Sequence, residues 1–356
     1  MKLTAPLVLP PLSALYRVIT KTRLSMYRRG TFRTTKLDRP VISIGNITTG
    51  GTGKTPLVEY VARLLSTRGL KVCVLTRGYG RTRPDERVLV SDGESVYSTA
   101  AEAGDEAFLL ATNLKGLVAV ISDSNRIAAG EDAIKHLGTD CFVLDDGFQH
   151  LRLARDLDIV VIDATNPWGG GRLLPEGRLR EPLEGLNRAA CIVLTRTDQV
   201  DNIQRIREEL QAFSQSPTFT SRMKTIDLVP LNGAPPNLLG PIGAFCGVGN
   251  PQSFFGHLRR EGYAPVFERA MRDHQTYTQD HIDSICAGAA KSGAVSLITT
   301  AKDAVKLKSL NLSLPTYALE VQISIDNDAE FSDLILKAIN TPTNRTDQTA
   351  RFAATK

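Results

Sequence analysis

The sequence predicts an α/β protein with a mainly parallel sheet and helices on both faces. Over residues 41–195, apolar runs typical of buried strands alternate with segments of helical spacing, the order expected of parallel strands joined by crossover helices. A glycine-rich turn joins the first strand to the first helix. A second, shorter alternation covers residues 242–321. Because 356 residues exceed one typical domain and fit two, we expect a second, smaller α/β domain.

The individual elements are placed from apolar runs and helical periodicity. Residues 215–240 are rich in Pro, Ser, Thr and Asn and indicate a linker with room for a pair of strands. The first alternation predicts strands at 41–45, 71–76, 117–121, 141–145, 158–163 and 191–195 and helices at 55–67, 101–113 and 126–137. The second predicts strands at 242–246, 264–267, 295–299 and 316–321 and helices at 252–261 and 279–291.

These elements divide the chain into four parts. We expect a basic amphipathic segment at 1–36, the larger α/β domain at 37–215 and the smaller one at 216–340. The polar tail at 341–356 is expected to fray.

Positive charge is concentrated at the N-terminus. The chain has a net charge of +5, but residues 1–40 alone have a net charge of +8. Within 12–29, leucines, tyrosines and an isoleucine are interleaved with Arg and Lys. Such a basic amphipathic helix can lie in a bilayer interface, or it can pack as a surface helix on its own domain. Composition leaves both interpretations open.

Composition also argues against several classes of protein. The five cysteines form no C-x-x-C pair and indicate buried thiols in a reducing cytosol rather than a disulfide framework. No uninterrupted apolar run reaches the roughly 18 residues of a spanning helix, and early prolines disfavour a secretory signal. No nucleic-acid-binding motif accompanies the modestly basic pI, so no nucleic-acid partner is expected.

The glycine-rich turn has the pattern of a phosphate-binding loop. Gly45–Thr55 follows the apolar run Val41–Ile44 and precedes an amphipathic segment, the strand–turn–helix context that such a loop requires. Glycines let backbone N–H groups surround an anion, and the helix N-terminus adds its positive dipole end. Lys54 would reach the β- and γ-phosphates of a nucleotide, and Thr55 would hold Mg²⁺. The strict pattern has glycine where Thr48 stands, so a turn that binds nothing is the alternative. We assign nucleotide binding to Thr49, Gly50, Gly51, Thr52, Gly53, Lys54 and Thr55, in a fold like that of P-loop NTPases.

Two carboxylates, Asp145 and Asp146, stand at the end of the expected strand 141–145. An acid at the end of an apolar strand holds Mg²⁺ in phosphoryl-transfer proteins. A doubled carboxylate before glycine is poor core material, which makes a purely structural role a weak alternative. We therefore assign Mg²⁺ to Thr55, Asp145 and Asp146, with Gln149 in support. His150 follows, although a lone histidine is more often structural than catalytic.

Three further segments contain candidate site residues. Arg77 and Tyr79 stand on a glycine turn after a strand and could meet a phosphate or a sugar face, although a plain turn is equally compatible. Asp105 suits the start of a helix as a favourable carboxylate. The connection 166–182 is long for a compact domain, and such loops are commonly functional. It contains Arg172, Arg178, Arg180 and Glu181.

Taken together, these segments resemble tetraacyldisaccharide 4'-kinase, the ATP-dependent kinase of lipid A biosynthesis. The resemblance covers residues from about 7 to 335. It rests on Gly45–Pro56, TRGYGR (76–81), GDEA (104–107), DDGFQH (145–150), LDIVVID (157–163), GGGRLLPEGRLREP (169–182), GVGNPQSFF (247–255), DHQTYT (273–278) and TAKDAVKL (300–307).

The resemblance implies a reaction and a location. With ATP and Mg²⁺, such an enzyme transfers the γ-phosphoryl group to the 4'-hydroxyl of a tetraacylated glucosamine disaccharide 1-phosphate. It works as a peripheral protein at the cytoplasmic face of the inner membrane of Gram-negative bacteria. An acylated substrate is met at the bilayer, so the resemblance favours membrane contact for the N-terminal helix.

The resemblance also implies roles for residues. Asp105 would be the base, aided by His274 of the smaller domain, and Lys54 would neutralise phosphate charge. Because Asp105 and His274 lie in different domains, catalysis would require domain closure. Substrate contacts are expected from Arg77, Tyr79, Gln149, His150, Arg180 and Glu181. The chain departs from the family pattern at four positions. Pro is common where Ala107 and Arg178 stand, His where Gln275 stands, and Glu where Ala301 stands.

Two other functions stay open from the sequence. Phosphate loops with doubled glycine also occur in membrane-associated ATPases and GTPases that act as switches or assembly factors. A nonenzymatic membrane adaptor would leave the loop without a purpose. The smaller domain with His274 and the loop 169–182 favour the kinase.

Overall fold

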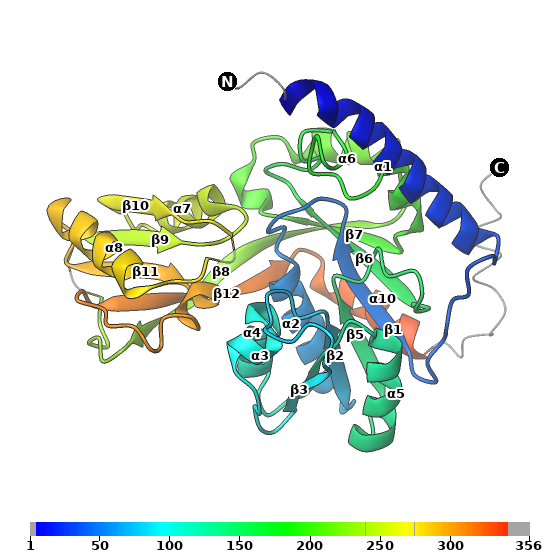
Figure 1. Cartoon of the computed structure of the whole chain (residues 1–356), viewed down its shortest axis with the longest axis horizontal. Coiled ribbons are helices and arrows are strands. Elements are labelled where there is room, and N and C mark those ends of the chain that lie inside the picture. Colours follow the sequence, from blue (N-terminus) through cyan, green and yellow to red (C-terminus); the bar gives the residue numbers. More distant parts are fainter. Residues whose placement is uncertain (1–4, 239, 274, 341–356) are drawn as a thin grey trace.

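One 12-stranded sheet runs through the molecule in the computed structural model, which describes residues 5–238, 240–273 and 275–340 (Figure 1). The strand order is β10-β9-β11-β12-β8-β7-β6-β1-β5-β2-β4-β3, with the bounds given next. The strands are β1 (Val41–Asn46), β2 (Val72–Thr76), β3 (Val88–Asp92), β4 (Val118–Ser122), β5 (Cys141–Asp145), β6 (Leu157–Asp163), β7 (Cys191–Thr195), β8 (Thr218–Leu231), β9 (Ile242–Cys246), β10 (Phe267–Ala270), β11 (Ser296–Thr300) and β12 (Thr316–Ile325).

Helices cover both faces of the larger part of this sheet, which comprises β7, β6, β1, β5, β2, β4 and β3. The smaller part comprises β9, β10 and β11. Alternate residues of the buried strands pack against α2, α4 and α10 on one face and against α5, α6 or a 3₁₀ turn at Leu183–Arg188 on the other. The helices are α1 (Ala5–Arg28), α2 (Lys54–Ser66), α3 (Ala100–Ala103), α4 (Asp105–Asn113), α5 (Arg126–Leu137), α6 (Ile203–Gln211), α7 (Pro251–Arg260), α8 (Gln279–Lys291), α9 (Ala301–Ala304) and α10 (Asp328–Asn340). The predicted α/β class is confirmed.

The central strands β1, β2, β4, β5, β6 and β7 are parallel and buried along almost their whole length. Both faces of such strands are covered, which explains their continuous apolar sequences. Strand β1 lies between β5 and β6, so the turn after β1 opens at the carboxyl edge beside the ends of both neighbours. Ligands of open α/β sheets bind at this edge.

The segment 215–240, expected to be a linker with room for a pair of strands, is mostly the single long strand β8. Its first residues pair in parallel with β7, and the rest pairs antiparallel with β12. These two strands join the larger part of the sheet to β9, β10 and β11 (Figure 1). The chain then returns, since α10 places Phe331 against Phe219 and Tyr60 of the larger part.

Other differences have local causes. The helix expected at 101–113 is divided at Gly104, whose φ of 91° and contact with the Tyr79 carbonyl leave no room for a side chain. The strand expected at 264–267 is β10, three residues later. The N-terminal helix covers Ala5–Arg28 of the described residues and contains Pro10 and Pro11. Strand β3, α6 and α10 were not predicted from the sequence.

Candidate active site

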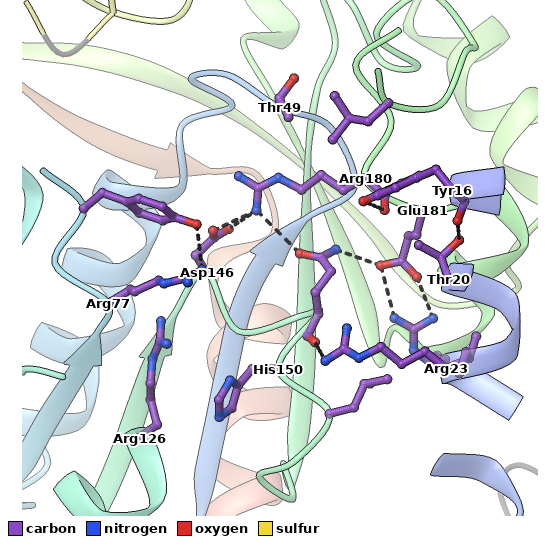
Figure 2. Close-up of a pocket in the computed structure, with 16 residues that line it drawn as sticks. Tyr16, Thr20, Arg23, Thr49, Arg77, Arg126, Asp146, His150, Arg180 and Glu181 are labelled. Carbon is purple, nitrogen blue, oxygen red and sulfur yellow. Dashed lines mark hydrogen bonds and ion pairs between the residues drawn. The ribbon is translucent and has the colours of Figure 1, made fainter. Parts of the chain in front are cut away.

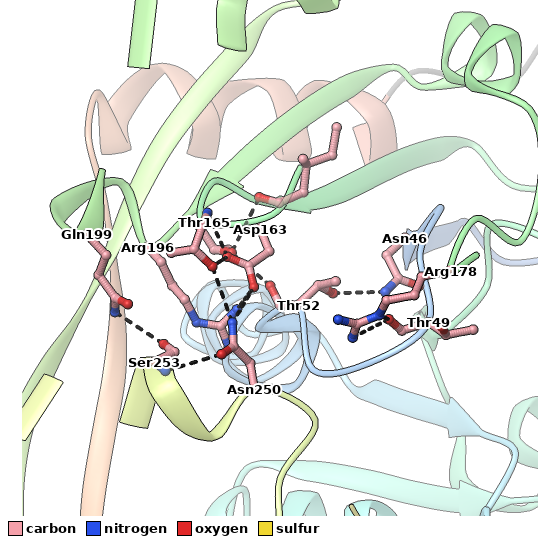
Figure 3. A network of polar contacts seen from close by, with 12 residues as sticks. Asn46, Thr49, Thr52, Asp163, Thr165, Arg178, Arg196, Gln199, Asn250 and Ser253 are labelled. Atoms are coloured by element: carbon pink, nitrogen blue, oxygen red, sulfur yellow. Dashed lines mark hydrogen bonds and ion pairs between the residues drawn. The ribbon is translucent and has the colours of Figure 1, made fainter. Parts of the chain in front are cut away.

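The turn between β1 and α2 is built as an anion cradle. Gly50 and Gly53 have positive φ angles of 105° and 85°, which residues with a Cβ rarely adopt. Gly53 is the N-cap of α2, and no side chain caps this end, so first-turn N–H groups are available for an anion. The Asn46 amide donates to Thr52 Oγ1 at 3.0 Å, and the Thr195 hydroxyl donates to the Thr52 carbonyl at 2.8 Å. The turn is therefore held in shape from two sides (Figure 3).

Arg178 of the long connection lies against this turn. Its Nη2 and Nε donate to the Thr49 carbonyl at 2.8 and 3.1 Å, and the Thr49 N–H donates to the Arg178 carbonyl at 2.7 Å (Figure 3). A Cβ on Gly50 would come within 2.0 Å of the same guanidinium. The arginine that replaces the common proline is thus a clamp on the phosphate loop.

Asp145 and Asp146 occupy different electrostatic environments. Asp145 is buried at the end of β5 and accepts a 3.0 Å hydrogen bond from the Thr76 hydroxyl. Burial, together with the nearby Glu106 and Asp146 carboxylates, raises the pKa of Asp145 to about 7. Burial also opposes ionisation of Asp146, but the Lys54 and Arg180 cations hold its pKa below the ordinary value. The surroundings therefore raise the pKa of Asp145 and lower that of Asp146, although the two residues are adjacent in the sequence.

Asp146 joins the phosphate loop to the loop 169–182. Lys54 Nζ lies 3.3 Å from Asp146 Oδ1, and Arg180 Nη1 donates to both carboxylate oxygens at 2.8 and 2.7 Å. Asp146 has a φ of 53°, a left-handed conformation that Asp tolerates better than most residues. This conformation directs the side chain toward the two cations.

The donor set fits Mg²⁺ bound together with nucleotide phosphates. Mg²⁺ is usually held by one or two carboxylates plus phosphate oxygens and waters, so a dedicated protein cage is not required. The described residues contain no cluster of three or more His, Cys, Asp or Glu that could hold a metal ion. The buried Oδ1 of Asn46, beside the loop, has no hydrogen-bond partner among the described residues. Thr55 and Asp145 are the residues that would hold the ion.

A pocket of about 470 Å³ opens beside the phosphate loop (Figure 2). One wall is α1, which is fixed by hydrogen bonds from Ser13 to the Leu173 carbonyl and from Tyr16 to the Arg180 carbonyl. Five of the lining side chains are arginines, whereas two are acids. The predicted residues Arg77, Tyr79, Gln149, His150, Arg180 and Glu181 all line this pocket, together with Arg23, Arg126 and Arg188.

The cations of the pocket are suited to an anionic group. Arg126 is buried, its Nε has no hydrogen-bond partner within the described residues, and burial lowers the pKa of its guanidinium.

His150 is also half-buried among arginines, and burial lowers its pKa to about 4, so the ring is neutral. Sequence reasoning missed Arg126, although it follows β4 at the carboxyl edge where ligand residues are expected.

Glu181 is buried in a polar network at the inner end of the pocket. Gln149 Nε2 donates to Glu181 Oε1 at 2.7 Å and to the Asn46 carbonyl at 2.9 Å. Arg188 forms two hydrogen bonds with Glu181, the shorter at 2.8 Å, and its guanidinium lies 4.3 Å from the centre of the Phe148 ring. These contacts fix Gln149 between the phosphate loop and the pocket.

The smaller part of the sheet also contacts the phosphate loop. A Cβ on Gly249 would come within 2.4 Å of the Gly51 nitrogen, so only glycine fits there. Asn250 Nδ2 donates to Asp163 Oδ2 at 2.9 Å, and the same oxygen pairs with Arg196 (Figure 3). The turn 247–250 therefore lies directly on the loop.

Asp105 lies at the first position of α4 and outside the lining of the pocket. Its Oδ2 is 2.8 Å from Lys306 Nζ, which comes from the segment after α9. His274, the expected partner of Asp105, lies outside the described residues.

The outer side of α1 is apolar and exposed. Leu15, Val18 and Ile19 are 56%, 61% and 55% exposed. Among the helices that the structure describes, none is long and apolar enough to cross a membrane.

Comparison with known proteins agrees with these features. The family model described as Tetraacyldisaccharide-1-P 4'-kinase (LpxK) matches residues 5–340. Tetraacyldisaccharide 4'-kinase of Desulfotalea psychrophila is 39% identical over 92% of this chain and 94% of its own length. The Geobacter sulfurreducens protein of the same name is 42% identical over 90% of this chain and 89% of its own.

A solved structure is similar over the same extent. LpxK from Aquifex aeolicus in complex with ATP has a TM-score of 0.72 and 30% sequence identity, covering 92% of this chain and 98% of that one. The resemblance inferred from the sequence motifs is thereby confirmed, and the chain belongs to the tetraacyldisaccharide-1-P 4'-kinase family.

Proposed function

We propose that this protein transfers the γ-phosphoryl group of ATP to the 4'-hydroxyl of a tetraacylated glucosamine disaccharide 1-phosphate. The products are ADP and the 4'-phosphorylated lipid A precursor. The observation that supports this most directly is the contact chain Lys54–Asp146–Arg180. It joins the loop that would hold the transferred phosphoryl group to the cationic pocket, so a donor and an acceptor would meet at Asp146.

The nucleotide would be held by the turn between β1 and α2. Backbone N–H groups from Gly50 to Thr55 would surround the phosphates, and Lys54 would leave Asp146 to contact them. Thr55 and Asp145 would hold Mg²⁺, which when bound neutralises charge on the β- and γ-phosphates. Asp145 is the better of the two acids for this role, because Asp146 is already paired with two cations.

The acceptor would occupy the pocket between α1 and the carboxyl edge of the sheet. Arg126 would meet the charge of the 1-phosphate, since a buried guanidinium whose Nε has no partner among the described residues gains most from an anion. The exposed Arg77 and Arg23 would add positive charge. Tyr79 and His150 would contact the sugar. Acyl chains would leave the pocket along α1, whose exposed apolar side chains would enter a bilayer surface.

Proton removal from the 4'-hydroxyl requires a base. We assign this role to Asp105, with His274 as its partner, as the family resemblance implies. The protein would act peripherally on the cytoplasmic face of the inner membrane, where ATP is available.

One assay tests the proposed function. The protein is incubated with γ-labelled ATP, Mg²⁺ and detergent-dispersed tetraacylated disaccharide 1-phosphate. The expected result is label in the lipid in proportion to ADP, with none entering an acceptor that lacks the 4'-hydroxyl. Label that appears only as free phosphate would instead support a switch ATPase.

A further inference from the structure

The segment 300–307 contacts both the turn 247–250, which lies on the phosphate loop, and the start of α4. Asp303, which is fully buried, accepts hydrogen bonds from the Gly247 N–H and the Thr300 hydroxyl, each at 2.8 Å. Gly247 begins the turn whose Gly249 lies on Gly51. The position of α9 is therefore tied to the position of the turn over the phosphate loop.

Two lysines of this segment reach two consecutive acids of the larger part. Lys306 Nζ lies 2.8 Å from Asp105 Oδ2, and Lys302 Nζ lies 3.1 Å from Glu106 Oε1. The Lys306 side chain is 9% exposed, and that of Lys302 is 17% exposed. The spacing of four residues places both lysines on one side of a helical turn, facing the first turn of α4.

The Lys306 ion pair is not a surface contact. Water is largely excluded from it, so the Coulomb attraction is screened less than in an exposed pair. Lys306 Nζ also donates to the Gln275 carbonyl at 3.2 Å, which fixes the ammonium from a second direction. An ammonium held in this way defines where Asp105 Oδ2 can lie.

We propose that Lys306 is a positioning residue for Asp105. It would hold the carboxylate in the orientation needed to take the proton of the acceptor hydroxyl, and only when the turn 247–250 lies on the phosphate loop. This inference rests on the proposed function, because it needs Asp105 to be the base. It assigns to the end of the TAKDAVKL segment a role in kcat rather than in nucleotide binding.

The test compares Lys306→Met with matched variants of the same segment. Lys306→Met removes the charge and keeps most of the length, and Lys306→Arg keeps the charge. Lys302→Met removes the ion pairs of Lys302 with Glu106 and Asp273 and leaves the pair of Lys306 with Asp105 in place. Lys308→Met removes an exposed charge two residues away, whose ammonium lies 5.2 Å from the centre of the Phe108 ring and does not pair with Asp105.

We expect Lys306→Met to lower kcat about 100-fold, the scale of an active-site displacement of about 1 Å. The KM for ATP should change less than about threefold, and Lys306→Arg should recover most of kcat. Lys302→Met should lower kcat by less than about tenfold, and Lys308→Met should behave as wild type. Thermal unfolding of each variant reports whether the fold is retained. Equal losses in Lys302→Met and Lys306→Met would overturn the inference, because they would indicate a general interface effect.

A double-mutant cycle separates positioning from an independent role. If Lys306 acts through Asp105, Lys306→Met should cause no further loss of kcat in an Asp105→Asn background. Multiplicative losses would refute the inference. If the wild type labels the lipid and Lys306→Met labels it equally fast, only this inference fails. If the wild type releases free phosphate alone, the proposed function fails first.

Discussion

Lys54 Nζ lies 3.3 Å from Asp146 Oδ1, so the phosphate-loop lysine is paired with a carboxylate in this structure. Arg180 pairs with the same carboxylate from the opposite loop. Nucleotide phosphates would have to compete with Asp146 for the lysine, whereas Asp146 would keep Arg180. Loss of Lys54 therefore leaves no unpaired acid behind.

For this reason Lys54→Ala should abolish turnover and leave the fold intact. The lysine neutralises phosphate charge and contributes little packing, and Arg180 still forms an ion pair with Asp146. The measurements are lipid labelling and the thermal unfolding midpoint. Lys71→Ala, which removes an exposed lysine, is the control and should have no effect on labelling. Activity within tenfold of wild type in Lys54→Ala would overturn the assignment of the phosphate loop.

The raised pKa of Asp145 predicts a pH-dependent stability. Burial beside Glu106 and Asp146 raises its pKa from 3.8 to about 7, so the folded state binds this proton more tightly than the unfolded state. The free energy of unfolding should then fall as the pH rises from about 4 to about 7. Asp145→Asn should flatten this slope. At pH values above 7 it should also raise the denaturant concentration at the midpoint of unfolding, yet it should abolish phosphoryl transfer.

Glu59 provides the matched control for Asp145. Burial also raises the pKa of Glu59 to about 7, and its Oε1 accepts a hydrogen bond from Asn113 away from the site. Glu59→Gln should flatten the same pH window while kcat is retained. Chemical denaturation at several pH values gives the slopes, and an unchanged slope in Asp145→Asn would contradict the burial argument.

The parts of the fold that were predicted correctly include strands that are buried on both faces and the amphipathic helices α5 and α8. β5 and β7, for example, have the bounds expected from the sequence, because four apolar residues in succession precede a polar end. β8 was missed since most of its residues are partly exposed and Pro230 interrupts a polar sequence typical of a linker. Its partner β12 is distant in the sequence, so no local pattern reveals the pairing.

The candidate site was predicted residue by residue, but not as an arrangement. The phosphate-loop pattern located Lys54, the acids at the end of an apolar strand located Asp145 and Asp146, and the long connection 166–182 pointed to Arg180 and Glu181. Their contacts depend on how the loop 169–182 packs against the phosphate loop, which no sequence spacing determines. Tyr16 and Arg23 were missed as pocket residues because an amphipathic helix pattern does not say which surface its inner side meets.

The clamp on the phosphate loop predicts an effect of Arg178 on nucleotide binding. Arg178→Pro removes both donors to the Thr49 carbonyl but keeps the carbonyl that accepts from the Thr49 N–H. Because the side chain is exposed, we expect a rise in the KM for ATP of about three- to tenfold, the equivalent of about one hydrogen bond, with little change in kcat.

Steady-state kinetics with varied ATP measures this effect. Arg172→Ala is the control, since Arg172 is an exposed arginine of the same loop that pairs with Glu176. An unchanged KM in Arg178→Pro would show that the clamp is not needed to shape the loop.

The outer side of α1 predicts binding to a lipid surface. Leu15, Val18 and Ile19 are exposed, so replacing all three by serine should leave the helix packed through Ser13 and Tyr16. Co-sedimentation with anionic vesicles should fall, and the KM for the acylated acceptor should rise while the KM for ATP stays constant. High salt should loosen the remaining binding if Arg17 and Lys21 contact headgroups.

Ile226→Ser is the matched control for α1, because Ile226 is similarly exposed at 59% but lies on β8. Equal vesicle binding by the triple variant and the wild type would remove α1 as the membrane contact.

The last prediction concerns the proposed base. Asp105→Asn preserves shape and removes the proton acceptor, and His274→Ala removes the partner that the family resemblance implies. If the two act as one unit, each change should lower kcat severely with a modest effect on the KM for ATP. The double variant should then be far less impaired than the product of the two defects. A purely structural Asp105 at the start of α4 predicts a different result: a loss of stability from both the helix dipole and the broken ion pair with Lys306, with kcat nearly retained. Multiplicative defects would indicate independent roles, and a stable, fully active Asp105→Asn variant would refute the assignment.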